Sequence, residues 1–103
     1  DRTFDMVLLG MGEDGHTASL FPGHQYDAGE LVHAVHHAPK PPADRISLGL
    51  ASLRATRQLL LLVTGSSKQE ALARWAAGDS LPVAAIVPDC GVDLLLDTGA
   101  AGI

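Results

Sequence analysis

A histidine closely preceded by two acidic residues is the part of the sequence best suited to chemistry. These residues are Glu13, Asp14 and His16, within the segment VLLGMGEDGHTASLFPG. Imidazole accepts a proton near neutral pH, and a neighbouring carboxylate can orient the ring and stabilise its charged form. We therefore predict that His16 is a general base with Asp14 or Glu13 as its partner, and that backbone N–H groups of residues 15–18 face a developing oxyanion. The alternative is a loop histidine beside solvated acids.

Glycines with the spacing G-x-G-x-x-G precede this histidine: Gly10, Gly12 and Gly15. The same spacing occurs in dinucleotide-binding loops. We reject that function because Glu13 and Asp14 would place negative charge beside a pyrophosphate. Pro22 would also end the following helix early, and the letters HAVHHA stand where a ribose-binding acid is required. The glycines instead predict a sharp turn that lets the backbone approach a ligand.

Hydrophobic patterning predicts the elements that must position these residues. Strands are predicted at residues 4–10, 30–38, 45–50, 57–65, 81–88 and 92–97. Helices are predicted at residues 14–20, 51–56, 67–77 and 98–103. Ser52 and Ser67 are candidate N-caps, Glu70 completes a capping box with Ser67, and Gly78 is the expected helix end. Strands that alternate with helices indicate one α/β domain with a largely parallel sheet.

The composition limits the classes of protein to consider. The chain has 103 residues, a formal net charge of −5 and 47% hydrophobic residues, which predicts one small packed domain. The acidic balance argues against general binding of nucleic acid or anionic membranes. No apolar stretch reaches the length that spans a bilayer. Cys90 is the only cysteine, so no internal disulfide can form, and we interpret it as a small buried or turn residue.

A group of histidines raises the question of a metal site: His24, His33, His36 and His37. On a strand, His33 and His37 would share a face while His36 points to the other. No paired cysteines or helical His-Glu pattern accompanies them, so we predict no metal site. The letters GSSK, residues 65–68, likewise lack the full pattern of a nucleotide-binding loop.

Four segments, taken together, resemble one known family. GMGEDGHTASLFPG, residues 10–23, is similar to the most specific motif of the 6-phosphogluconolactonases. PPADRISL, LLLVTGSSKQEAL and LLLDTGAAG resemble that family's later motifs in the expected order. The related glucosamine-6-phosphate deaminases share the Gly-x-Gly-x-Asp-Gly-His core but continue toward Asn-Glu-Pro-Gly, where this chain has SLFPG. The resemblance therefore favours the lactonases.

The resemblance implies a fold and an activity. Residues 1–103 would be a single partial domain, the C-terminal half of a three-layer, Rossmann-like α/β domain with a largely parallel sheet. Family members hydrolyse 6-phosphoglucono-1,5-lactone to 6-phosphogluconate in the oxidative pentose phosphate pathway, without metal or cofactor, and we expect a cytoplasmic enzyme. His16 matches the family's general base, which activates a water, and Asp14 matches the motif's acid, which we expect to orient the loop or the ring.

The resemblance also implies how the substrate binds. Arg45 and Lys68 match family positions suited to a sugar phosphate, and Gly12 and Gly15 belong to the loop that the substrate meets. Without the resemblance, Arg45 reads as a surface charge and Lys68 as a solvated residue at a helix start. The expected partner molecules are the lactone and an upstream half of the same protein that carries a phosphate-binding loop, with no nucleic acid and no membrane. The alternatives are a glucosamine-6-phosphate deaminase or isomerase, and a non-catalytic fragment.

Overall fold

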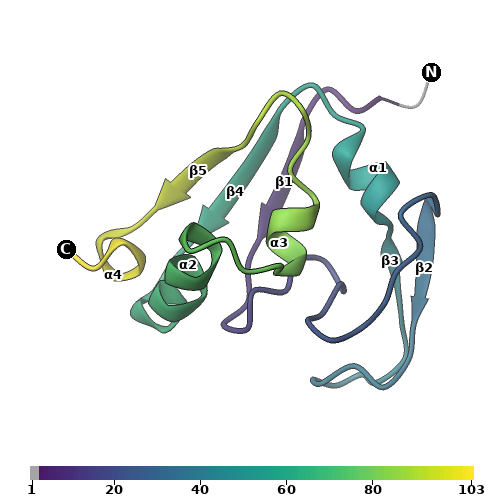
Figure 1. The fold of residues 1–103 in the computed structure, drawn as a ribbon, viewed down its shortest axis with the longest axis horizontal. Helices are drawn as coiled ribbons and strands as arrows, with labels where there is room; N and C mark the ends of the chain where they lie inside the picture. The colour runs from purple at the N-terminus through teal and green to yellow at the C-terminus, as the bar shows by residue number, and fades with distance from the viewer. Residues whose placement is uncertain (1–2) are drawn as a thin grey trace.

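The computed structural model describes residues 3–103, and its centre is a parallel sheet (Figure 1). The sheet consists of β1 (Val7–Gly10), β4 (Leu59–Val63) and β5 (Asp93–Leu96), in the order β1-β4-β5. Both pairings are parallel, with Leu8 opposite Leu60 and Leu62 opposite Leu95. The predicted α/β class with a parallel sheet is therefore confirmed, and the carboxyl ends of all three strands meet at one edge.

The two remaining strands form a hairpin of their own. β2 (Val32–Val35) pairs antiparallel with β3 (Arg45–Leu48), and the two make a separate two-stranded sheet. An antiparallel pair needs only a loop to join its strands, whereas neighbouring parallel strands need a longer crossover. That loop, residues 36–44, lies at the same end of the molecule as the carboxyl ends of β1 and β4 (Figure 1).

Short helices connect the strands: α1 (Leu50–Arg54), α2 (Gln69–Ala76), α3 (Pro82–Ala85) and α4 (Thr98–Ala101). A 3-10 turn, η1 (Ser66–Lys68), leads from β4 into α2. The predicted capping box does not form, because α2 begins after Lys68 and no side chain caps it. Gly78 follows the helix with φ of 94°, as expected of a helix-ending glycine.

Three further local predictions were also wrong. Residues 14–20 form turns instead of a helix, because Thr17 donates its hydroxyl to the Gly10 carbonyl at 2.7 Å and pairs with Leu20 across a tight bridge. Residues 82–85 of the predicted strand 81–88 form α3, which places Pro82 in the first helical turn, where proline is favoured. Ser52 does not cap α1, since its hydroxyl donates to the Leu31 carbonyl.

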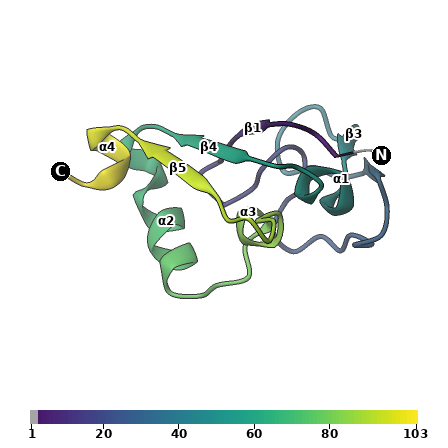
Figure 2. The ribbon, with the colours of Figure 1, turned by 90° about the horizontal axis from the view of Figure 1, so that it is seen from above.

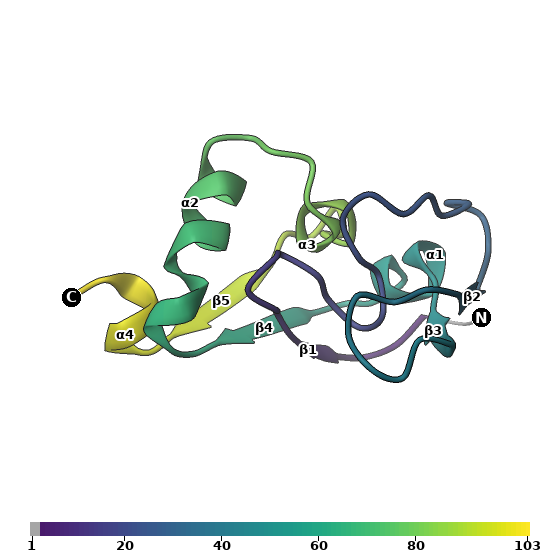
Figure 3. The same cartoon turned by 90° about the horizontal axis from the view of Figure 1, so that it is seen from below.

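The sheet buries one face and exposes the other. Leu59, Leu61 and Val63 of β4 are buried on the face covered by α2 and α3. Figures 2 and 3 show both helices on the same side of the sheet. On the opposite face, three leucines remain exposed to 61%, 48% and 51%: Leu8, Leu62 and Leu95. The described residues thus form two layers, and the third layer of the predicted fold stays a prediction. None of the helices in residues 3–103 is long and apolar enough to cross a bilayer.

Candidate active site

The loop that follows β1 carries the histidine at the carboxyl edge of the sheet. β1 ends at Gly10, and the chain turns back on itself through hydrogen bonds from the Gly12 N–H to the His16 carbonyl and from the Gly15 N–H to the Gly12 carbonyl. Ligands of parallel sheets bind beyond this edge, at the carboxyl ends of the strands. His16 therefore lies at the edge of the sheet where such ligands bind.

Asp14 binds the His16 ring directly. The distance from His16 Nδ1 to Asp14 Oδ1 is 2.6 Å, and the same carboxyl oxygen accepts the His16 backbone N–H at 3.0 Å. A carboxylate only accepts hydrogen bonds, so Nδ1 carries the proton and Nε2 is left as the proton acceptor. The His16 side chain is 19% exposed, which keeps the ring accessible. Of the two acids considered, the structure thus pairs Asp14 with the ring, and Glu13 lines the neighbouring cavity.

The environment of Asp14 keeps its carboxyl ionised. Partial burial acts to raise the pKa of Asp14, but hydrogen bonds from the His16 backbone and ring, together with the attraction of that ring's charge, lower it below its ordinary value. The carboxylate is therefore charged throughout the range in which a histidine titrates. A permanently charged partner stabilises the imidazolium that forms when His16 accepts a proton.

Two glycines of the loop are required for different reasons. A Cβ atom on Gly12 would overlap the His16 ring, so only glycine allows the ring to lie across this part of the backbone. Gly15 has φ of 86°, and a Cβ there would lie 2.8 Å from Cδ1 of Leu81. Gly12 thus makes room for the imidazole, and Gly15 packs against the residue that precedes α3.

The predicted oxyanion donors are largely used within the loop. The N–H groups of Gly15, His16 and Thr17 donate to the Gly12 carbonyl, the Asp14 carboxylate and the Leu20 carbonyl. A donor that already serves the loop cannot also be aimed at a substrate without breaking that bond. The prediction that residues 15–18 together face an oxyanion is therefore wrong for these three positions.

A cavity of about 500 Å³ opens beside His16. It is lined by Gly10, Met11, Gly12, Glu13, His16, Thr17, Ala18, Lys40 and Lys68. Its size lies within the range of small-molecule sites. Of the four residues predicted to bind substrate, Gly12 and Lys68 line this cavity, whereas Gly15 and Arg45 do not. Lys40 was missed, because the loop that carries it has no pattern that places it near His16.

Lys68 reaches the cavity from the turn after β4. Its Nζ donates to the Thr64 carbonyl at 3.2 Å, within the same turn. Asp97, after β5, accepts hydrogen bonds from the N–H groups of Gly65 and Ala100 at 3.0 and 2.8 Å. These backbone donors hold the pKa of Asp97 below its ordinary value. Asp97 thereby links the turn that presents Lys68 to the start of α4.

Arg45 does not line this cavity, and its guanidinium binds the loop between β2 and β3. Its Nε donates to the Pro42 carbonyl at 2.9 Å, and its Nη2 donates to the carbonyls of Lys40 and Pro41 at 2.7 and 2.9 Å. The guanidinium also lies 5.3 Å from the centroid of the Phe21 ring. Direct contact between Arg45 and a substrate stays a prediction, because in this arrangement its donors bind the protein's own backbone.

The other histidines and the cysteine do not line the cavity beside His16. His33 is buried at 3% exposure, and His36 pairs with Asp44 at 3.1 Å on the surface. His37 lies beyond the end of β2, so it does not share a strand face with His33. Within residues 3–103, no three potential ligands are grouped so as to hold a metal ion. Cys90 lies in an exposed turn, so the expectation of a turn residue is confirmed.

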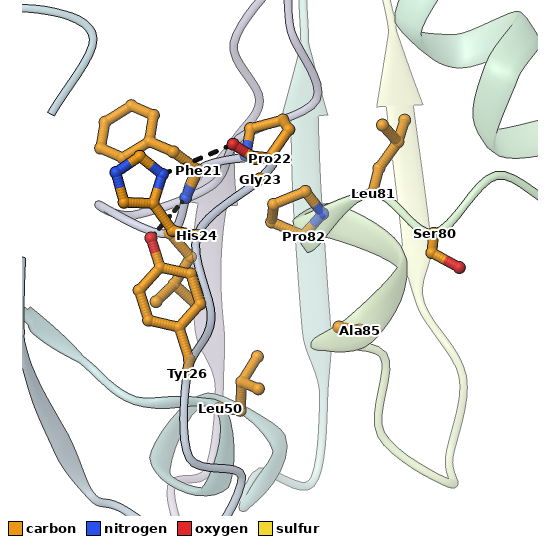
Figure 4. Close-up of a pocket in the computed structure, with 11 residues that line it drawn as sticks. Phe21, Pro22, Gly23, His24, Tyr26, Leu50, Ser80, Leu81, Pro82 and Ala85 are labelled. Carbon is orange, nitrogen blue, oxygen red and sulfur yellow. Dashed lines mark hydrogen bonds between the residues drawn. The ribbon is translucent and has the colours of Figure 1, made fainter.

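A second cavity, of about 220 Å³, lies next to the turn formed by residues 20–24 (Figure 4). Leu81, Pro82 and Ala85 form part of its wall, and the Phe21 N–H donates to the Tyr26 hydroxyl at 2.8 Å. His16 and Asp14 do not contribute to it. The cavity therefore lacks the acid–base pair, and we place the candidate chemistry in the larger cavity.

Comparison with known proteins identifies relatives of this chain. The family of glucosamine-6-phosphate isomerases and 6-phosphogluconolactonase matches residues 1–95. The 6-phosphogluconolactonase of Rattus norvegicus is 38% identical over 103 residues, which cover 95% of this chain and 40% of the rat protein. The structure of the 6-phosphogluconolactonase from Trypanosoma cruzi superposes with a TM-score of 0.80 at 32% identity, covering 97% of this chain and 41% of that one.

A deaminase structure is also similar. A monomeric glucosamine-6-phosphate deaminase superposes with a TM-score of 0.76 at 26% identity, over 95% of this chain and 47% of the deaminase.

This chain spans about two fifths of the length of the rat relative. The match over residues 1–95 and the shared fold show that the chain belongs to the glucosamine-6-phosphate isomerase/6-phosphogluconolactonase family.

Proposed function

We propose that the protein carrying this chain hydrolyses 6-phosphoglucono-1,5-lactone to 6-phosphogluconate. The observation that carries the proposal is the His16–Asp14 pair, with its 2.6 Å hydrogen bond, beside a cavity that two lysines also line. Hydrolysis of the phosphorylated lactone needs an activated water and positive charge near the phosphoryl group. This cavity offers a base, His16, and two cations, the lysines. The relatives named 6-phosphogluconolactonase support the choice of substrate.

The reaction follows from the orientation of the ring. Nε2 of His16 takes a proton from a water molecule as the water oxygen attacks the lactone carbonyl carbon. The tetrahedral oxyanion then collapses and breaks the bond to the ring oxygen, which takes the proton back from the imidazolium. One water is consumed and the ring opens to a carboxylic acid that ionises. Throughout, Asp14 keeps the proton on Nδ1 and stabilises the charged ring, as a carboxylate does in other acid–base pairs.

Lys68 supplies positive charge to the substrate's phosphoryl group in this proposal. The ammonium is a compact charge with three donors, which suits phosphate oxygens. The rest of the phosphate site belongs, in the proposal, to an upstream part of the protein, since the relatives are longer than this chain. A cytoplasmic location is part of the same proposal, and a single cysteine is compatible with a reducing compartment.

Deamination of glucosamine 6-phosphate is the second candidate, because a deaminase structure has a similar fold. The sequence after the shared histidine separates the two activities: this chain has Ser19, Leu20 and Phe21 before Pro22 and Gly23. Leu20 and Phe21 are buried, at 0% and 1% exposure. These positions therefore provide apolar packing rather than a further carboxylate, which favours the lactonase.

The test compares both activities on the purified natural protein that contains these residues. Lactone hydrolysis is followed by proton release, with the spontaneous opening of the lactone subtracted, and deamination is followed by ammonia release. We expect catalysed hydrolysis of the phosphorylated lactone and no ammonia. Ammonia release without lactone hydrolysis would replace the first activity with the second.

A further inference from the structure

Lys40 is the cation of the cavity that the sequence analysis did not single out. It lies in the loop between β2 and β3, far along the chain from both His16 and Lys68, yet all three line the same cavity. We propose that Lys40 binds the phosphoryl group of the substrate together with Lys68, and that Arg45 is a positioning residue that holds Lys40 there. The proposal rests on the proposed function for the identity of the substrate.

The charges around the cavity favour an anionic ligand at this place. Its ionisable lining residues are Lys40, Lys68, Glu13 and His16. Two lysines outnumber the single acid, although the chain as a whole has a net charge of −5. A phosphorylated substrate requires positive charge at the binding site itself. The negative net charge of the whole chain does not prevent binding there. Lys40 doubles the cationic contribution that Lys68 makes alone.

Arg45 fixes the backbone that carries Lys40. Its guanidinium donates to three successive carbonyls, those of Lys40, Pro41 and Pro42, at 2.7 to 2.9 Å. The Ala38 N–H closes the same loop by donating to the Ala43 carbonyl at 2.9 Å. A planar guanidinium can direct Nε and Nη2 at neighbouring oxygens in fixed directions, which a lysine ammonium cannot do. The loop that presents Lys40 is therefore built around Arg45.

The same arginine is connected to the base through one aromatic ring. Its guanidinium lies 5.3 Å from the centroid of Phe21, and the His16 ring lies 4.7 Å from that centroid. Phe21 is 1% exposed, so it is a buried ring that both groups contact. Because His16 and Arg45 both contact the Phe21 ring, this ring relates the position of the Lys40 loop to that of the proposed base.

The first test removes the charge of Lys40 and measures binding instead of turnover. The Kd of 6-phosphogluconate and of gluconate is measured by calorimetry on the natural protein and on Lys40→Gln. We expect Lys40→Gln to weaken 6-phosphogluconate binding about tenfold, a common cost of losing one charge-assisted hydrogen bond, and to leave gluconate binding unchanged. Arg54→Gln is the matched control, because it removes one exposed positive charge on α1, outside the cavity.

The second test asks whether Arg45 acts through Lys40. Arg45→Lys keeps the charge but cannot hold three carbonyls, so we expect it to weaken 6-phosphogluconate binding nearly as much as Arg45→Gln does. In the Lys40→Gln background, Arg45→Lys should change that binding less than twofold, because the group it positions is already absent. Thermal unfolding of every variant checks that the protein remains folded. Because Lys40 is exposed, Lys40→Gln tests the role of Lys40 in phosphate binding independently of any effect on folding.

The outcomes separate this inference from the proposed function. Equal loss of 6-phosphogluconate and gluconate binding in Lys40→Gln, or no loss of either, would overturn the role of Lys40. Additive effects of Arg45→Lys and Lys40→Gln would show that Arg45 contacts the ligand itself, which overturns its positioning role. A protein that binds 6-phosphogluconate selectively through Lys40 but does not hydrolyse the lactone would overturn only the proposed function.

Discussion

At the scale of single residues, the geometry around His16 assigns each neighbour a separate task. Asp14 fixes the tautomer through the 2.6 Å bond to Nδ1, and Gly12 leaves the space that the ring occupies. Phe21 packs against the ring at 4.7 Å between centroids. Asp14 holds the proton on Nδ1, and the contacts with Gly12 and Phe21 fix the position of the ring. Nε2 therefore remains the atom available for proton transfer.

Replacing the base should affect turnover far more than binding. In the natural protein, we expect His16→Ala to lower kcat for the lactone by about 10²–10⁴-fold while KM changes little, because proton transfer is needed only in the transition state. Steady-state kinetics on both proteins, corrected for spontaneous opening, provide the measurement. His24→Ala is the matched control, since His24 does not line the large cavity. Near-normal kcat in His16→Ala would remove it from the role of base.

A single methyl group at Gly12 should reproduce much of that loss. Because the added Cβ would overlap the His16 ring, we expect Gly12→Ala to turn the ring away from Asp14 and to lower kcat at least tenfold, which corresponds to about 1.4 kcal/mol. Gly29→Ala is the control, since its added Cβ would meet only the Asp27 carboxyl at 3.4 Å. Full activity of Gly12→Ala would contradict the geometry of this loop.

The lowered pKa of Asp14 has a consequence for stability. A carboxyl whose pKa is lower in the folded than in the unfolded state stabilises the fold fully above its unfolded pKa, and this contribution is lost as the pH falls through the folded pKa. We therefore expect the difference in unfolding free energy between the parent and Asp14→Asn to shrink as the pH falls from about 5 to below about 4. Urea unfolding across this range measures it; a difference that grows on acidification contradicts the assignment.

At the scale of elements, the turns after parallel strands determine what reaches the cavity. The turn after β1 presents His16, and the turn after β4 presents Lys68. Asp97, after β5, binds the Gly65 N–H and so ties the third strand's end to the second strand's turn. Adjacent strand ends thus cooperate in one site, as the parallel arrangement requires.

Asp97 provides a test of this connection between strand ends. Asp97→Ala removes the N-cap of α4 and the acceptor for Gly65, which should lower the stability of the fold. With the turn loosened, we expect KM for the phosphorylated lactone to rise more than kcat falls. Asp79→Ala, which removes an exposed acid paired with Arg74, is the control. Unchanged KM in Asp97→Ala would show that the turn holds Lys68 without this acid.

Local sequence patterns predicted the elements where pattern and packing agree. The apolar runs of β1 and β4 predicted their strands correctly, although one face of each strand is exposed. β2 was also predicted as a strand, and its buried positions are His33 and Val35. Residues 82–85 were assigned to a strand because a short apolar run does not distinguish a strand from a helix. Residues 14–20 fold into turns because Thr17 and Asp14 bind backbone groups of the loop, which periodicity cannot reveal.

The candidate site was predicted in part for a similar reason. His16, Asp14 and Lys68 lie in segments whose local chemistry is visible in the sequence, and the structure brings His16 and Lys68 to one cavity. The place of Lys40 beside His16 depends on how the hairpin packs beside the sheet, whereas Arg45 binds carbonyls within its own loop. Such long-range placement carries no local signal, so nothing in the sequence singled out Lys40. The substrate role of Arg45, which the family resemblance implied, stays a prediction.

At the scale of the whole molecule, the uncovered face of the parallel sheet is the feature with the largest consequence. Leu8, Leu62 and Leu95 are exposed on this face, whereas the opposite face is packed against α2 and α3. β1 and β5 also border the described sheet, each with one partner strand. An apolar face and open strand edges promote association with another polypeptide. The chain spans about two fifths of the rat relative, so additional chain to cover this face is available in proteins of that length.

We therefore predict that the 103-residue chain alone self-associates and hydrolyses the lactone little faster than buffer does. Sedimentation velocity and a lactone assay on the same sample test both statements. Leu62→Lys with Leu95→Lys should reduce self-association, because two charges on the uncovered face oppose its burial. Ile46→Lys is the matched control, since Ile46 is 80% exposed on β3, outside the parallel sheet. A stable monomer with substantial turnover would show that the site is complete within these residues and that the exposed leucines need no cover.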